Sequence, residues 1–355
     1  AGGVSRQVKL ALDEYQKARM QFISEVSRLM KKKDSLVLQV FMDAEIVSLM
    51  MKPLIQDVIP TVRINSLQVL EQITELTDAA DEQFTDPGEL QKMKTSLTCK
   101  NPLVQRQGCL TLAAIACKHT SHAKAVLEAD VLPSLQLQLA AVDPKTKEAT
   151  VKLINTLVAS DLSTCNEIMK PQTIQDMVYN LHLAETSEGL KTAITHNLAD
   201  TASVSAALAQ RVLDTKALSP VTALLHSPQA GPQLKSACLL LLGQVAKHND
   251  QLAAEVMQQD VERPAMDCLL DQSAGVRLNA ALLVHEVAKK SSFLCEKMLA
   301  DGGIAVLGKH LLTEAGSTNA LPTILALGAA ADFSHPLALQ AVKTGAAKAL
   351  VRYLH

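Results

Sequence analysis

Apolar residues recur along this chain in a pattern that repeats about every 42 residues. Each copy ends a segment whose apolar residues follow helical spacing, as in CLTLAAIACKH, CLLLLGQVAKH and NAALLVHEVAKK. One interval between copies is longer than the rest, and its surplus lies in His226 to Gln233 (HSPQAGPQ). No alternating strand pattern accompanies the repeats, so the sequence predicts an all-α fold. The seven anchor positions are Ile73, Ile115, Leu157, Leu198, Val245, Val287 and Ala330.

One repeat unit contains three helical segments, illustrated by residues 121–130, 131–139 and 145–159. The third and longest segment carries an apolar stripe that a single repeat cannot bury, so neighbouring repeats must stack on each other. For the same reason we expect Leu282→Asp to break stacking by placing an unpaired charge in the interface. These features predict an armadillo-type α-solenoid, a right-handed superhelix of three-helix repeats. The stripe is exemplified by Ala281, Val284, Val287 and Ala288.

The repeats define the expected domain organisation. Residues 1–33 are expected to form an N-terminal capping helix, amphipathic from Ser5 to Met30 and ending in the basic turn Lys31 to Lys33. Residues 34–355 contain seven armadillo repeats and a partial eighth. Because a solenoid needs a polar cap at each end, we expect the natural protein to continue beyond His355.

Composition narrows the class of function. The net charge is −2, which gives no overall bias toward nucleic acid or an anionic membrane. Aromatic residues make up 2 % with no Trp, so neither a base-stacking surface nor a small-molecule pocket is indicated, and no apolar run approaches membrane-spanning length. The seven cysteines include no CxxC pair, which indicates small apolar thiols in a reduced, cytoplasmic environment.

Several segments resemble one particular armadillo family in sequence and in order. They resemble the armadillo-repeat protein of the ciliary central apparatus, the sperm-associated antigen six family, over nearly the whole chain. Features such as YQKARMQF, DVIPTV and the GSTNALP insertion are not general armadillo features. The segments include EYQKARMQFISEVSRL (Glu14 to Leu29), AEIVSLMMKPLIQDVIPTVR (Ala44 to Arg63), QVAKHNDQLAAEVM (Gln244 to Met257) and GSTNALPTILALGAAADFSHPLAL (Gly316 to Leu339).

The chain also departs from this family. The family's KHSPELAQ-like junction persists at Lys118-His119 and Lys247-His248, but other residues replace it at 159–168 and 199–208. These departures leave a second interpretation open, in which the protein is a paralogue at a different position in the axoneme.

The third helices can be compared with the armadillo groove that binds nuclear-import signals. Proteins with that groove resemble one another in carrying a Trp and an Asn four residues apart on each third helix. This spacing places both side chains on one face of the helix. Here no Trp and one Asn occupy the equivalent positions, so an import adaptor is not predicted. The polar residues at these positions are the candidate protein-binding residues of the concave groove, with a solvated helix face as the alternative: Gln68, Gln72, Lys152, Thr156, Asn197, Gln244 and Glu286.

No catalytic or metal-binding motif is complete. The segment His285 to Lys289 differs from HExxH because Lys289 cannot supply the second imidazole. His119 and His122 have no third ligand near them in sequence, so we interpret them as a stray surface pair, and the Lys-His dipeptides as cations at helix C-termini. Gly302, Gly303 and Gly308 fit no phosphate-binding motif, and the double glycine is a turn device. We therefore expect no enzyme activity, no cofactor, no metal and no small-molecule substrate.

Two hypotheses of function remain. The family resemblance implies a non-catalytic structural scaffold of the ciliary or flagellar axoneme that supports motility. Its partners would be axonemal proteins and the tubulin lattice of a central-pair microtubule, with homo-oligomerisation left open. The alternative is a cytosolic armadillo adaptor that binds a partner peptide in its concave groove. The mixed charges of the candidate groove residues disfavour a catenin-like basic groove.

Overall fold

The fold is that of a computed structural model that describes residues 2–32, 34–314 and 317–354, with side chains between residues 6 and 351 of those ranges. Lys33 of the predicted basic turn, Gly316 of the family-like insertion, and His355 lie outside the described residues. All secondary structure in the described ranges is helical. The chain divides into two compact units, residues 1–168 (unit 1) and 169–355 (unit 2), which are treated separately below.

The helices follow each other in groups of three, as the repeat pattern predicts. Unit 1 contains α1 (Gly2–Met30), α2 (Ser35–Asp43), α3 (Ile46–Gln56), α4 (Pro60–Leu76), α5 (Asp81–Thr85), α6 (Pro87–Leu97), α7 (Pro102–Ala116), α8 (Thr120–Glu128), α9 (Leu132–Leu139), α10 (Pro144–Val158) and α11 (Leu162–Ile168). Unit 2 contains α12 (Pro171–His182), α13 (Glu188–Val204), α14 (Ala206–Asp214), α15 (Leu218–His226), α16 (Pro232–Ala246), α17 (Asp250–Met257), α18 (Glu262–Cys268), α19 (Ala274–Ala288), α20 (Ser292–Met298), α21 (Gly303–Thr313), the 3₁₀ helix η1 (Thr318–Ala320), α22 (Leu321–Phe333), α23 (His335–Lys343) and α24 (Ala346–Leu354).

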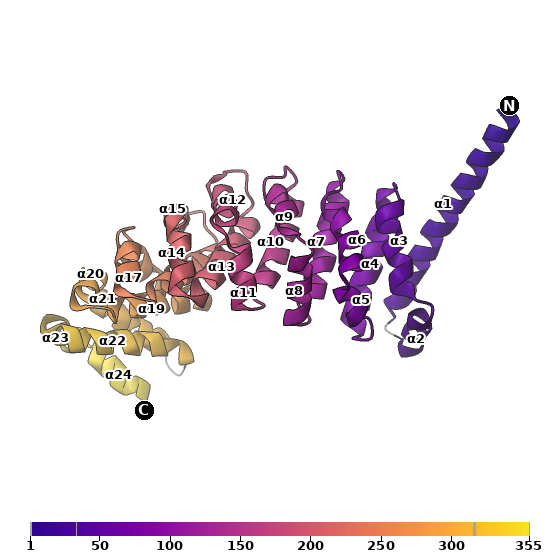
Figure 1. The fold of residues 1–355 in the computed structure, drawn as a ribbon. Helices are drawn as coiled ribbons and strands as arrows, with labels where there is room; N and C mark the ends of the chain where they lie inside the picture. Colours follow the sequence, from indigo (N-terminus) through magenta and orange to yellow (C-terminus); the bar gives the residue numbers. More distant parts are fainter. Residues whose placement is uncertain (1, 33, 315–316, 355) are drawn as a thin grey trace. The chain divides into compact units, whose positions relative to one another are not determined.

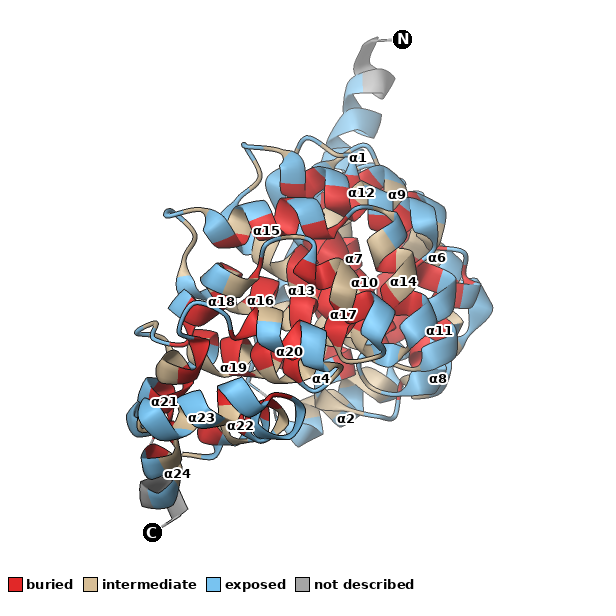
Figure 2. Cartoon of the chain, turned by 90° about the vertical axis from the view of Figure 1, so that its left-hand side faces the viewer, coloured by how far each residue is buried: buried red, intermediate tan, exposed pale blue. Residues whose placement is uncertain are grey.

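The third helix of each group forms the core of the stack. In unit 1, α7 packs between α4 and α10 (Figure 1). In unit 2, α16 packs between α13 and α19, and α19 also contacts α22. Figure 2 shows the buried faces of these helices in red. All seven predicted anchors lie on these helices and are at most 1 % exposed. The 42-residue pattern therefore identified the buried face of each third helix correctly.

The predicted stacking residue Leu282 was wrong by one position. Leu282 is partly exposed on α19, whereas its neighbour Leu283 is fully buried. The Cα atom of Leu283 would lie 3.6 Å from a Cβ atom built on Gly243 of α16, which places the two helices in close contact. The stripe residue Val284 is fully buried as predicted. A helix turns by about 100° per residue, so adjacent leucines on one helix face different surroundings.

Local sequence signals mark where the third helices α7 and α10 begin. Asn101 accepts a hydrogen bond from the backbone N–H of Leu103 at the start of α7, and Asp143 accepts one from Thr146 at the start of α10. Each of these caps precedes a proline, Pro102 or Pro144, at the first helical position. Proline costs little there because the N–H it lacks would have no partner within the helix.

Most turns between first and second helices share one backbone conformation, the turns after α5 and α11 being exceptions. Each of the other turns has a residue with a positive φ angle, a region in which Asp and Gly are over-represented. Gly302, the predicted turn glycine, has φ of +90° and directly precedes α21. The non-glycine residues with positive φ in the described ranges are Glu45, Asp130, Lys216, Asp260 and Asp301.

The predicted N-terminal helix is present as α1 and packs on α4 through one part of its length. Ile23, Val26 and Met30 are 2 % exposed. By contrast Leu12 and Tyr15 are 55 % and 60 % exposed, and this end of the helix extends away from the other helices of unit 1 (Figure 1). The C-terminal part of α1 therefore covers the first repeat. No helix in the described ranges is long and apolar enough to span a membrane.

Candidate functional site

The third helices of unit 1 line two adjoining cavities. The first, of about 330 Å³, is lined by α4, α7 and α10. The second, of about 590 Å³, lies at the C-terminal ends of α7 and α10. Cys117, Lys118 and Thr156 line both cavities, so we treat the two as one feature and call it the unit 1 groove. The lining residues of the first cavity are Glu71, Thr74, Glu75, Leu110, Ala113, Ala114, Cys117, Lys118, Lys152 and Thr156.

Two of the four candidate residues in unit 1 line this groove. Lys152 is exposed, and its backbone carbonyl accepts a hydrogen bond of 3.0 Å from the hydroxyl of Thr156. Gln68 and Gln72 are partly exposed on α4, but the α4 side chains in the first cavity are Glu71, Thr74 and Glu75. The structure thus brings Lys152 and Thr156 together in the groove, with Gln68 and Gln72 on the same helix as its acidic wall.

Two buried side-chain amide oxygens on these helices have no hydrogen-bond partner among the described residues. They are Oδ1 of Asn155, which lines the second cavity, and Oε1 of Gln72 on α4. A buried acceptor without a donor costs about 1 to 3 kcal/mol. Both atoms are buried, so the backbone N–H groups of a bound chain would reach them only once the amide side chains turn toward the groove.

The surroundings of Glu71 perturb the pKa of its carboxyl. Burial raises the pKa of its carboxyl, and the neighbouring charge of Glu75 raises it further. A hydrogen bond of 2.5 Å from Nε2 of Gln107 and the positive charge of Lys152 act in the opposite direction. The acidic wall formed by α4 is therefore only partly neutralised by its own surroundings.

Lys118 is held by the start of its own repeat and by the end of the preceding one. Its ammonium lies 2.7 Å from Asp78, 2.9 Å from Asp81 and 2.7 Å from the carbonyl oxygen of Thr77, the residue that directly follows α4. These contacts raise the pKa of Lys118 although burial, the largest single influence, acts to lower it. The Lys-His dipeptides were predicted to place cations at helix C-termini. Lys118 does so, but the C-terminus that it contacts is that of α4 in the preceding repeat.

The interpretation of His119 and His122 as a stray surface pair was wrong for one of the two. His119 is exposed, but the side chain of His122 is 4 % exposed, and burial lowers its pKa. Both imidazoles face Asp81, at 3.9 Å and 3.7 Å. The ammonium of Lys118 already bonds to the carboxylate of Asp81, which disfavours a metal ion between Asp81 and the two imidazoles.

The three remaining candidates lie in unit 2, on α13, α16 and α19. Asn197 is fully buried, and neither polar atom of its side chain has a hydrogen-bond partner among the described residues. Gln244 is partly exposed with its Oε1 atom buried and unpaired. Glu286 lies 2.6 Å from Lys289. Unpaired amides therefore recur on the third helices of both units.

Sequence reasoning missed Asn155 and Glu71. The expected Asn position lies directly before the anchor, which selected Thr156 and Gln72, whereas Asn155 and Glu71 lie one residue earlier on α10 and α4. The asparagine in LINTLVA was itself a usable signal. The burial that perturbs Glu71 depends on the neighbouring helix and has no local signature.

The cysteines carry no sign of a reactive site. Five of the seven are buried, and burial raises the pKa of the Cys109 and Cys238 thiols to about 12. Cys117 is the exposed exception, at the rim of the groove. Within the described ranges no group of three or more His, Cys, Asp or Glu side chains is arranged to hold a metal ion.

Comparisons with known proteins identify the fold. No protein-family model and no curated protein matches the chain. Among solved structures, a computationally designed armadillo repeat protein for modular peptide recognition matches with 20 % identity and a TM-score of 0.63, covering 69 % of this chain and all of that one.

Two further structures support the same fold. A designed armadillo repeat protein in complex with the peptide (KR)4 has 20 % identity and a TM-score of 0.63, covering 68 % of this chain and 99 % of its own. An engineered protein with 16 % identity and a TM-score of 0.65 covers 93 % of this chain and 90 % of its own. The chain therefore has the armadillo-repeat fold, as the sequence predicted.

Proposed function

We propose that this protein is a non-catalytic scaffold that binds an extended segment of a partner protein in the unit 1 groove. The observation that carries the proposal is Asn155, which lines that groove and whose buried, unpaired Oδ1 atom becomes an acceptor for a bound chain once its amide turns toward the groove. An extended chain presents backbone N–H groups at regular intervals and can pair with such acceptors without a particular sequence.

The surroundings of Asn155 suit a peptide better than a small molecule. The groove is open, and it is shared by two cavities that run across successive third helices. Its charges are mixed rather than uniformly basic, with Glu71, Glu75, Lys118 and Lys152 in the first cavity. The two designed armadillo proteins described above, one made for modular peptide recognition and one in complex with a peptide, support this mode of binding.

The proposal can be tested by selecting peptides against the purified protein. Ten-residue peptides enriched from a random library would be labelled, and their Kd measured by fluorescence anisotropy. We expect Asn155→Leu to weaken binding about tenfold or more, because it removes the acceptor. Asn166→Leu is the matched control, since Asn166 is exposed on α11 and hydrogen-bonds within its own helix. Failure to enrich any peptide, or equal affinity for Asn155→Leu, would refute peptide binding in this groove.

A more specific proposal concerns where in the cell the scaffold lies. The sequence resemblance described above supports the axoneme of a cilium or flagellum, with axonemal proteins and tubulin as partners and a role in motility. A repeat stack offers long faces, which suits assembly interfaces that commonly bury more than about 2,000 Å². Of the two hypotheses from the sequence, the adaptor binds its partner in the concave groove, whereas the axonemal scaffold was argued from the long faces of the stack.

Localisation of a tagged copy in a motile ciliated cell would test the axonemal address. We expect a signal along the central pair that disappears in cells without a central pair. A signal on the outer doublets would indicate a paralogue at another axonemal position. A diffuse cytosolic signal would refute the axonemal address and favour the adaptor.

A further inference from the structure

The unit 1 groove carries a charge order that runs across its three helices. Glu71 and Glu75 on α4 form one wall of the first cavity, and Lys152 on α10 forms the opposite wall. The floor between them comes from α7, where Ala113 is buried and Ala114 is partly exposed. Acidic, small apolar and basic surfaces therefore follow one another from α4 to α10.

The charges at the two ends are available to a ligand. Lys118 is a second cation in the cavity, but it is already bonded to Asp78, Asp81 and the Thr77 carbonyl, so it does not neutralise the acidic wall. Burial raises the pKa of the Glu71 carboxyl, and the charge of Lys152 acts to lower it, so the two ends partly interact with each other. Lys152 forms no salt bridge within 4 Å to another described residue. A ligand that carried both complementary charges would compensate both ends.

We propose that the segment bound in this groove carries a cationic side chain against Glu71 and Glu75, a small apolar side chain over α7, and a carboxylate against Lys152. This inference rests on the proposed function, because it assigns a chemical class to the ligand of the same groove. Neighbouring helices lie about 8 to 10 Å apart and an extended chain rises about 3.3 Å per residue. One helix spacing corresponds to about three ligand residues, so ligand residues about six apart lie over α4 and α10, although the charges of Glu71 and Lys152 are themselves close enough to interact.

Four synthetic peptides test this directly. Each has ten residues in a Ser and Gln background with blocked termini, and they differ at positions 2, 5 and 8: Lys-Val-Glu, Lys-Val-Gln, Gln-Val-Glu and Gln-Val-Gln. Blocked termini remove the end charges that would confuse the comparison. We expect the Lys-Val-Glu peptide to bind most tightly, with about fivefold loss for each charge removed and weaker binding at high salt.

Variants of the protein assign each charge to its wall. Glu71→Gln with Glu75→Gln should weaken the two Lys-bearing peptides about fivefold and leave the Gln-Val-Glu peptide unchanged. Lys152→Gln should do the reverse and weaken only the Glu-bearing peptides. Glu128→Gln is the control, because Glu128 is exposed at the end of α8 and lines neither cavity.

The outcomes separate this inference from the proposed function. If all four peptides bind equally and all lose affinity in Asn155→Leu, the charge inference is overturned while peptide binding in the groove stands. If none of the four binds but library peptides do, the charge inference is likewise overturned. If neither the four nor any library peptide binds, the proposed function fails with it.

Discussion

The side-chain nitrogen of Lys118 lies 2.7 Å from the carbonyl oxygen of Thr77, the residue that directly follows the third helix of the preceding repeat. The same relationship occurs within unit 2, where Nζ of Lys290 lies 2.7 Å from the carbonyl oxygen of Lys247. The last carbonyls of a helix have no partner within it, and a cation there also meets the negative end of the helix dipole. These lysines therefore join successive repeats at their helix ends.

Removing such a junction should destabilise the local stack. We expect Lys118→Met to lower the stability of unit 1 by about 1 to 3 kcal/mol, because it leaves the Thr77 carbonyl and two aspartates without their donor. Lys124→Met is the control, since Lys124 is 51 % exposed and pairs with Asp161 at the surface, a contact worth at most about 1 kcal/mol. Urea unfolding followed by circular dichroism would measure both. An equal, small effect of the two substitutions would contradict a joining role for Lys118.

The corrected stacking position gives a second prediction. Leu283→Asp should cost about 3 to 5 kcal/mol, because it buries an unpaired carboxylate between α19 and α16. Leu282→Asp should cost less than about 1 kcal/mol, since Leu282 is partly exposed. Amide hydrogen exchange of α16 and α19 would detect local opening of the stack. Comparable loss of protection in both variants would show that the assignment of the interface residue is incorrect.

Gly108 allows α7 to pack closely on α6. A Cβ atom at this position would lie 2.9 Å from Cβ of Ser96, which is fully buried on α6. Gly108→Ala should therefore destabilise unit 1 by about 1 to 3 kcal/mol, and adding Ser96→Gly should recover part of the loss. Gly189→Ala is the control, because a Cβ atom there would meet nothing beyond its own stretch of helix within 4 Å, and alanine favours a helix by up to about 1 kcal/mol. If thermal denaturation gave Gly108→Ala the stability of the wild type, the contact would be looser than described.

The sequence predicted the repeats well because periodicity reports burial directly. The seven anchors, the three-helix unit and the turn at Gly302 all depend on spacing and on local backbone preference. Leu282 was misassigned because a shift of one residue changes the helix face while leaving the period intact. His122 was misassigned because its burial depends on packing against another repeat. Glu71 was overlooked for the same reason, so the candidate site was only partly predictable.

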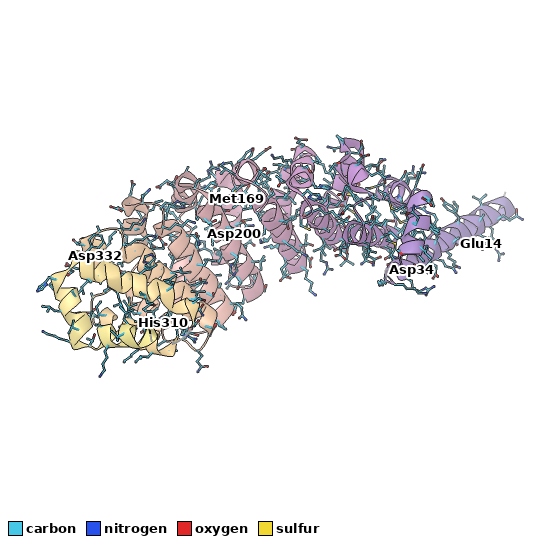
Figure 3. The ribbon with its side chains drawn as sticks, turned by 90° about the horizontal axis from the view of Figure 1, so that it is seen from below. Glu14, Asp34, Met169, Asp200, His310 and Asp332 are labelled. Atoms are coloured by element: carbon cyan, nitrogen blue, oxygen red, sulfur yellow. The ribbon has the colours of Figure 1, made fainter. Side chains whose placement is uncertain are left out.

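Unit 2 contains a buried histidine whose titration gives a predictable pH dependence. His310 is fully buried, and its Nδ1 atom lies 2.8 Å from the hydroxyl of Thr323 (His310 is labelled in Figure 3). Burial lowers the pKa of His310 from its ordinary value of 6.5; the nearby Glu314 acts to raise it and Arg277 to lower it. The folded protein therefore binds fewer protons here than the unfolded chain. Stability is complete above about pH 6.5 and is lost as the pH falls below it.

Replacing this imidazole should flatten the acid side of the stability profile. His310→Gln keeps a partner for Thr323 and removes the titrating group, so the slope of stability between pH 5 and 6.5 should fall by up to about 1.4 kcal/mol per pH unit. Urea midpoints measured across this range would show the change. The exposed His335 provides the control substitution, His335→Gln. An unchanged slope in His310→Gln would mean that His310 does not titrate on unfolding.

The central claim, that a partner segment lies in the unit 1 groove, is tested most directly by the reactivity of Cys117. This thiol is exposed and lines both cavities, whereas five other cysteines are buried. Alkylation of Cys117 would be followed by mass spectrometry with and without a saturating selected peptide, with Cys99 as the internal reference. We predict that the peptide slows alkylation of Cys117 in proportion to the bound fraction and leaves Cys99 unchanged. A peptide that binds tightly and leaves the Cys117 rate unaltered would contradict the account.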